Sequence, residues 1–307
     1  MPTLHKAIFA VLLLVLVALP FLVYPVFAMK VMCFALFAAA FNLLLGFGGL
    51  LSFGHAAYFG GASYVAAHAA KVWGFTPELA VLTGTAAAAV LGLAIGFLAI
   101  RRQGIYFAMV TLAFAQMVFF FALQAEFTGG EDGIQSVPRG DLFGLISLQN
   151  NLVLYFFVLA ITFGGILLIY RIIHSPFGQV LKAIRENEPR AVSLGYHVNR
   201  YKLMVFVLSA TLAGLAGATK SQVFQLASLT DVHWSMSGEV VLMTLLGGMG
   251  TIFGPLVGAT VIVTMQNYLA TLGAWVTIIQ GIIFVISVLL FREGIVGVIS
   301  RWLRRPL

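Results

Sequence analysis

Charged residues are scarce in this chain. Only 9% of its 307 residues are Asp, Glu, Lys or Arg, whereas soluble domains carry about a quarter. Hydrophobic residues make up 61%, and the mean hydropathy is +1.05. Apolar runs of about twenty residues, the length that an α-helix needs to cross a bilayer, recur from end to end. This composition excludes a water-soluble globule and predicts an all-α, polytopic membrane protein with one transmembrane domain over residues 1–307.

Several kinds of chemistry lack the residues they need. Cys33 is the only cysteine, which excludes a disulfide framework and a thiolate metal cluster. No Gly-Lys dipeptide occurs, so the phosphate-binding loop G-x-x-x-x-G-K-[ST] is absent. The six histidines are spread out without the spacing of a metal site. We therefore expect no metal, no cofactor and no catalytic residue. An intramembrane enzyme is the least favoured class, because His, Asp and Glu do not cluster.

Apolar runs and their breaks predict ten crossings. They are residues 7–28, 31–46, 52–70, 78–100, 105–124, 150–170, 203–227, 238–250, 252–271 and 275–291. The first run resembles a signal peptide ending near Ala28, but it is longer than a typical signal-peptide core, and we interpret it as a span. The stretch 238–250 is short and either crosses the membrane or re-enters it. An eight-span chain with re-entrant hairpins is the alternative.

The basic residues predict the orientation. The net charge of +7 does not indicate nucleic-acid binding, because the bases lie in short loops between apolar runs. With the N-terminus inside, 13 of the 17 Lys and Arg residues fall in inner loops, as the positive-inside rule requires. The remaining four are Lys30, Lys71, Arg139 and Lys220. We expect both termini to be cytoplasmic.

Two glycine-rich stretches indicate broken helices, "GFGGLLSFGHAAYFGGASY" (46–64) and "GGMGTIFGPLVGA" (247–259). Glycine interrupts a membrane helix where protein or a cavity satisfies the freed backbone groups, and many transporters build their pathway from such helices. Tight helix packing is the alternative for any single glycine. The glycines expected at the breaks are Gly48, Gly49, Gly54, Gly247, Gly248 and Gly254.

Uncharged polar residues within spans are the candidates for lining a pathway, because polar groups in a membrane are costly and often functional. They are Asn42, His55, Tyr58, Gln116, Gln266 and Asn267. Hydrogen bonding to a neighbouring helix is the alternative role. We find no titratable group at mid-membrane depth, which disfavours an ion-driven carrier.

One long polar segment, about residues 171–202, interrupts the apolar sequence. Ser175-Pro176 is a helix-start signal. Asn187 caps a second, very short helix in which Pro189 suits the first turn, and Gly195 ends it. Two turns of helix are not stable alone in water, so this helix needs a surface, either on its own chain or on a partner. An ordinary loop that only sets orientation is the alternative.

Four stretches carry a family resemblance. "AIRENEPRAVSLGYHVNRYKLMVFVLSATLAGLAGA" (183–218), "GIYFAMVTLAFAQMVFF" (104–120), "FTGGEDGI" (127–134) and "NLLLGFGGLLSFGHAAYFGGASY" (42–64) resemble permease subunits of branched-chain amino-acid ABC importers, LivM type. The resemblance covers about residues 31–291. It implies that the polar segment holds a coupling helix for a cytoplasmic ATPase. The implied docking residues are Arg185, Glu186, Asn187, Arg190, Leu194 and Gly195.

The same resemblance implies partners and a location. The partners are a second related permease, two cytoplasmic ATPase subunits and a periplasmic substrate-binding protein, and the location is the bacterial inner membrane. The implied cargo is a branched-chain or other hydrophobic amino acid; urea, amides and aromatic acids are the alternatives within the family. A stand-alone channel or ion-driven carrier is the alternative outside it.

Overall fold

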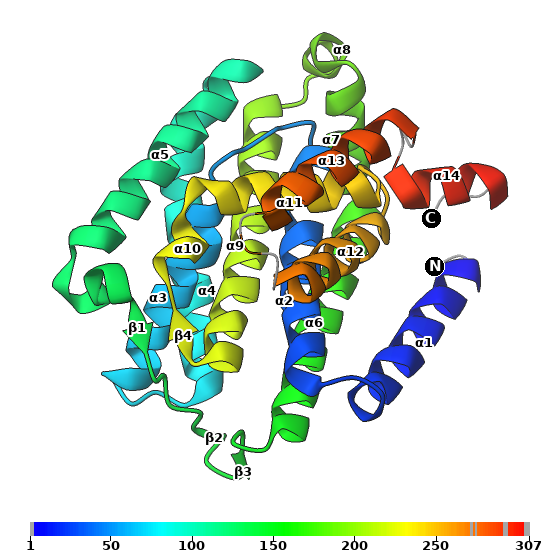
Figure 1. Ribbon diagram of the computed structural model, residues 1–307. Coiled ribbons are helices and arrows are strands. Elements are labelled where there is room, and N and C mark those ends of the chain that lie inside the picture. The colour runs from blue at the N-terminus through cyan, green and yellow to red at the C-terminus, as the bar shows by residue number, and fades with distance from the viewer. Residues whose placement is uncertain (1–2, 271–272, 274, 291–293, 304–307) are drawn as a thin grey trace.

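The computed structural model describes residues 3–270, 273, 275–290 and 294–303, and it is a bundle of helices with two minimal strand pairs (Figure 1). The elements are α1 (Thr3–Ala18), η1 (Leu19–Phe21), α2 (Pro25–Asn42), η2 (Leu43–Phe47), α3 (His55–Lys71), α4 (Pro77–Ala99), α5 (Ile105–Gln124), η3 (Glu126–Thr128), η4 (Gly130–Asp132), β1 (Ile134–Gln135), β2 (Asp141–Leu142), β3 (Ile146–Ser147), α6 (Asn151–Ile173), α7 (Pro176–Glu186), α8 (Glu188–Ser193), α9 (Val198–Phe224), β4 (Leu226–Ala227), α10 (Leu229–Val232), α11 (Trp234–Gly247), α12 (Gly254–Leu269), α13 (Trp275–Leu290) and α14 (Gly294–Leu303).

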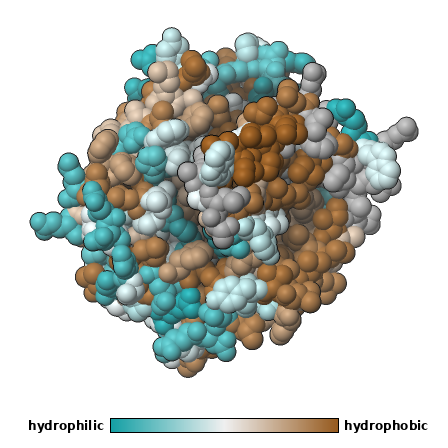
Figure 2. All heavy atoms as spheres, viewed as in Figure 1, coloured by the Kyte–Doolittle hydropathy of each residue, from teal (hydrophilic) through white to brown (hydrophobic). Residues whose placement is uncertain are grey.

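Among the described residues, five helices are long and apolar enough to cross a membrane. They are α2 together with η2, then α4, α5, α6 and α9. Hydrophobic residues cover broad areas of the surface (Figure 2), as lipid-facing helices require. The expectation of an all-α, polytopic membrane protein is therefore confirmed. Ten crossings and cytoplasmic termini stay predictions.

Some expected boundaries are wrong. The first two runs are separated at residues 22–24 and not at 28–31, because α2 begins at Pro25. Proline suits a first helical turn, where its missing N–H breaks no bond. Ala28 is consequently buried inside α2. Residues 271 and 291, the expected ends of the last two crossings, lie outside the described residues.

Helix α9 is the centre of the bundle and packs against α2, α3 and α4 (Figure 1). Small residues form these contacts. A Cβ atom added at Gly217 would lie 1.9 Å from the carbonyl oxygen of Phe59, and one at Gly214 would lie 2.2 Å from the Cβ of Ala88. Side chains this small let membrane helices approach closely. The glycines of α9 therefore fix how closely α3 and α4 approach it.

The bundle has two distinct ends (Figure 1). Helix α8 lies at one of them, which we call the α8 end. The opposite one, the strand end, carries the antiparallel pairs β1–β4 and β2–β3. There Arg139 donates from Nη1 to Asn151 Oδ1 at 3.0 Å and from Nε to the carbonyl of Gln222 at 3.3 Å. Arg139 thus joins the loop after β1 to the end of α9.

Candidate functional site

The polar segment folds as two capped helices. The Ser175 hydroxyl accepts a hydrogen bond from the Gly178 N–H at 3.3 Å, at the start of α7. The Asn187 side chain accepts one from the Arg190 N–H at 3.0 Å, at the start of α8. Gly195 follows with φ +87°, a left-handed conformation that favours glycine. The expected starts and stop are confirmed.

Helix α8 docks on its own chain through one side only. Ala191 is buried against Ile184 of α7 and Val198 of α9. The Glu188 carboxylate pairs with the Lys202 ammonium at 2.8 Å, which ties α8 to α9. In contrast, Val192 and Leu194 are 56% and 68% exposed. Ala191 is therefore the docked apolar residue, whereas Val192 and Leu194 form an exposed apolar pair.

The expected docking residues separate into two groups. Glu186, Arg190 and Leu194 are exposed on the α8 end. Arg185 is also exposed as a residue, yet its guanidinium turns inward and donates to the carbonyl of Gly46. A Cβ atom built on Gly49 would lie 3.0 Å from the Cγ atom of Arg185. Arg185 therefore links α7 to the first glycine-rich stretch.

Both glycine-rich stretches break their helices. After η2, a π-helical turn, the chain is non-helical over residues 48–54 before α3 begins. The second break separates α11 from α12 at residues 248–253. A Cβ added at Gly247 would lie 1.9 Å from the carbonyl oxygen of Gly254, so this turn requires glycine. The chain is thus interrupted within both glycine-rich stretches, whereas a role of these breaks in a pathway stays a prediction.

Asn42, the last residue of α2, joins the helix before the first break to the second break. Its Nδ2 donates to the carbonyl of Thr251 at 2.7 Å, and its Oδ1 accepts from the Gly250 N–H at 2.9 Å. Gly250 also lies beside the Arg185 guanidinium, because a Cβ atom built on Gly250 would lie 3.4 Å from Arg185 Nη1. We call Asn42, Gly46, Arg185, Gly250 and Thr251 the helix-break junction. It connects the polar segment to both broken helices.

Other elements surround the helix-break junction. A cavity of about 380 Å³ lies between the first break and the polar segment; Gly49, Gln103 and Glu188 are among its lining residues. The His5 ring contacts the rings of His174 and Phe253, so the start of α1 lies beside the second break. A Cβ built on Gly294 would lie 2.4 Å from the Cα of Gly248. Helices α1 and α14 therefore both contact the second break.

The six pathway candidates do not lie together at one place. Asn42 lies in the helix-break junction, and His55 is buried with its Nε2 at 2.8 Å from the Ser209 hydroxyl. Tyr58 is also buried, with its ring against His55. Asn42 and His55 thus hydrogen-bond neighbouring segments, the alternative role. The other three are dispersed: Gln116 is half-buried on α5, Gln266 lines a cavity near the strand end, and Asn267 is exposed on α12.

Sequence reasoning missed a charged cluster around that cavity. Lys30, Lys220, Asp231 and Glu239 line it together with Gln266. Lys220 pairs with Asp231, whose residue is only 1% exposed. The sequence signal was present, since Lys30 and Lys220 were among the few bases outside the expected inner loops, but nothing local indicated that these residues meet. Among the described residues, no group of three His, Cys, Asp or Glu side chains could hold a metal ion.

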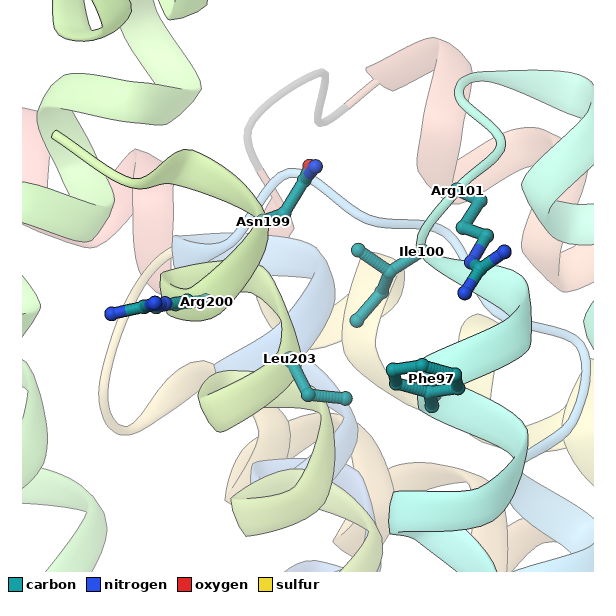
Figure 3. A pocket seen from close by; sticks show the side chains of 7 residues that line it. Phe97, Ile100, Arg101, Asn199, Arg200 and Leu203 are labelled. Atoms are coloured by element: carbon teal, nitrogen blue, oxygen red, sulfur yellow. The ribbon is translucent and has the colours of Figure 1, made fainter.

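A third hollow, of about 230 Å³, lies between the end of α4 and the start of α9. Phe97, Ile100 and Leu203 surround it, while Arg200 points away from it (Figure 3). The Arg101 guanidinium instead lies 4.9 Å from the centroid of the Phe97 ring. This hollow is therefore an apolar groove with a basic rim, without converging donors for an anion.

Comparison with known proteins places this geometry in a family. The family model described as "Branched-chain amino acid transport system / permease component" matches residues 25–288. The chain is 28% identical over 231 residues to the high-affinity branched-chain amino acid transport system permease protein LivM of Escherichia coli (strain K12), covering 68% of this chain and 54% of that protein. It is 31% identical over 195 residues to the ribose import permease protein RbsC of Bacillus subtilis (strain 168), covering 58% of each.

A further relative is the probable branched-chain amino acid transport permease protein LivM of Methanocaldococcus jannaschii, 29% identical over 180 residues, which cover 56% of this chain and 51% of that protein. The chain spans about half the length of the LivM relatives it matches. No solved structure matches significantly. Because the family model covers most of its length, the chain belongs to the family of branched-chain amino acid transport system permease components.

Proposed function

We propose that this chain is the membrane-spanning permease subunit of an ATP-binding-cassette importer of the bacterial inner membrane. It pairs with a second related permease, two cytoplasmic ATPase subunits and a periplasmic binding protein, and it moves branched-chain or other hydrophobic amino acids. The observation that carries this proposal is the Arg185 hydrogen bond to the Gly46 carbonyl. Through it, the segment that resembles a coupling helix contacts the broken helices directly.

Helix α8 is the element that receives force in this mechanism. Its exposed Arg190 and Val192, with Leu194 directly after it, form the contact with an ATPase. Ala191 and the Glu188–Lys202 pair hold α8 to α7 and α9, so a movement of α8 carries both helices with it. Arg185 then transfers the movement of α7 to the first break, and Asn42 transfers it to the second.

Glycine breaks are suited to respond to such a pull. Left-handed glycines such as Gly49 (φ +69°) and Gly250 (φ +78°) stand where the helices are interrupted. Hinges of this kind are a few element-terminal residues that absorb changes in φ and ψ. ATP-driven closure of the ATPases thereby switches the permease between outward and inward access.

The test is a charge reversal on α8. In the reconstituted importer, Arg190→Glu is expected to abolish ATP-dependent uptake and to reduce copurification of the ATPase subunits, while membrane insertion is normal. Arg102→Glu is the matched control, since Arg102 is exposed in the loop between α4 and α5, outside the polar segment. Uptake by Arg190→Glu at the level of Arg102→Glu would refute the docking role.

Cargo and energy source need separate assays. The LivM relatives support an amino acid, whereas the RbsC relative is named for ribose. Competition of uptake by leucine but not by ribose, urea or an aromatic acid is the expected result. A stand-alone channel or carrier would instead move solute in vesicles that contain this chain alone and no ATP.

A further inference from the structure

The cavity near the strand end is shaped for a small solute. It has a volume of about 320 Å³, at the lower end of the range of ligand pockets, about 300–1,000 Å³. Elements α2, α9, α10, α11 and α12 all contribute to its lining, and they meet in the middle of the bundle (Figure 1). We call it the strand-end cavity; Lys30, Lys220, Asp231, Glu239 and Gln266 form its polar side.

The strand-end cavity holds charges of both signs that do not all neutralise one another. Lys220 pairs with Asp231. Within the described part of the chain, no ion pair joins Lys30 to Glu239; the Glu239 carboxylate accepts a hydrogen bond from Gln266 Nε2 at 3.1 Å. Lys30 and Glu239 are half-buried and add a second set of opposite charges to the Lys220–Asp231 ion pair. The lining of the cavity therefore carries two basic and two acidic side chains.

Asp231 supplies a second, independent observation. The residue is 1% exposed, and its Oδ2 atom is buried without a hydrogen-bond partner among the described residues. Buried carboxylate oxygens almost always have a partner. Asp231 also lines the strand-end cavity, so a carboxylate that lacks one hydrogen-bond donor lies in the wall of the cavity.

The rest of the lining is apolar and aromatic. Phe34, Phe224 and Met236 line the strand-end cavity, and methionine adapts to ligands of different shape. The Lys220 ammonium lies 5.7 Å from the centroid of the Phe224 ring, which keeps a cation close to this apolar side. Opposite charges beside an apolar surface match a molecule that carries an ammonium group and a carboxylate group on the same carbon atom, together with an apolar side chain.

We propose that the strand-end cavity is a transport subsite for a zwitterionic amino acid. Lys30 binds its carboxylate, Asp231 and Glu239 bind its ammonium, and Phe34, Phe224 and Met236 contact its side chain. The proposal rests on the proposed function and deepens it, because the permease itself then recognises the cargo after the binding protein releases it. A neutral sugar would need no such pair of opposite charges.

The experiment uses the complete importer in proteoliposomes with leucine-loaded binding protein. Two rates are measured for each variant, leucine uptake and ATP hydrolysis, so that wild-type ATP-dependent uptake tests the proposed function independently. The variants are Lys30→Met and Glu239→Gln, each nearly equal in size to the native side chain. Lys30→Arg keeps the charge. Lys71→Met is the matched control, because Lys71 lies outside the strand-end cavity, where its Nζ donates to the carbonyl of Gln135.

We expect Lys30→Met and Glu239→Gln each to lower leucine transported per ATP hydrolysed roughly tenfold or more, as the loss of a hydrogen bond to a charged group predicts. Binding-protein-stimulated ATP hydrolysis should stay near the wild-type rate, Lys30→Arg should recover part of the uptake, and Lys71→Met should behave as wild type. Unchanged uptake in both variants would overturn the subsite. So would a parallel loss of uptake and ATP hydrolysis, because the two residues would then act on assembly or coupling and not on the cargo.

Discussion

Replacing Asn42 by leucine should separate the two broken helices. The substitution keeps the approximate size of the side chain but removes both hydrogen bonds that cross between the breaks. It leaves the Gly250 N–H and the Thr251 carbonyl without their partner in a partly buried place. Each unsatisfied group costs about 1–3 kcal/mol, so the free energy of unfolding should fall by about 2–6 kcal/mol. In chains of about 150–250 residues, a loss of 1 kcal/mol lowers the melting temperature by about 2–4 °C. The melting temperature should therefore fall by at least about 4 °C.

The chain carries its own probe for this measurement. Cys33 is its only cysteine and is 1% exposed, so a thiol-reactive dye reports unfolding of the detergent-purified protein. Asn267→Leu is the matched control, because Asn267 is exposed on α12 and exposed substitutions usually change stability by less than about 0.5 kcal/mol. Should Asn42→Leu and Asn267→Leu melt at the same temperature, the reasoning about the helix-break junction is refuted.

Three single contacts can each be tested by substitution. Arg185→Met should leave ATPase copurification intact but lower uptake strongly, because it removes the donor to the Gly46 carbonyl. Normal uptake by this variant would count against force transfer through Arg185. Gly217→Ala should destabilise the chain by about 1–3 kcal/mol through overpacking, since its Cβ would clash with the Phe59 carbonyl, whereas Gly164→Ala, with nothing within 4 Å, should not; equal melting temperatures would contradict this. A double-mutant cycle of Glu188→Gln and Lys202→Met should give a coupling energy of about 1 kcal/mol, measured by thermal unfolding, and zero coupling would show that the pair does not hold α8.

Local signals in the sequence were sufficient for the elements of the polar segment and for the breaks. Ser175 and Asn187 cap helices that begin next to them, and glycine at residues 247–254 stops a helix at that place. These effects act within a few residues, so a single sequence contains them. The start of α2 was misplaced because hydropathy does not register a break inside an apolar run; Pro25 was the available signal.

Contacts between distant segments could not be read from one sequence. Asn42 meets Gly250 across 208 residues, and Arg185 meets Gly46 across 139. Asn42 was predicted to line a pathway because it is polar within a span, and only the packing of α2 against α12 shows which groups it reaches. The same holds for the strand-end cavity, where Lys30 and Glu239 come from helices that local patterns do not bring together.

Photo-cross-linking from position 194 tests the central claim most directly. A photoreactive amino acid replaces Leu194, directly after α8, or Phe143 at the strand end as the control, and both side chains are largely exposed. Irradiation of cells is expected to join position 194, and not position 143, to a subunit that mass spectrometry identifies as a nucleotide-binding ATPase. A chain that cross-links to no ATPase from position 194, while uptake is intact, would contradict the central claim.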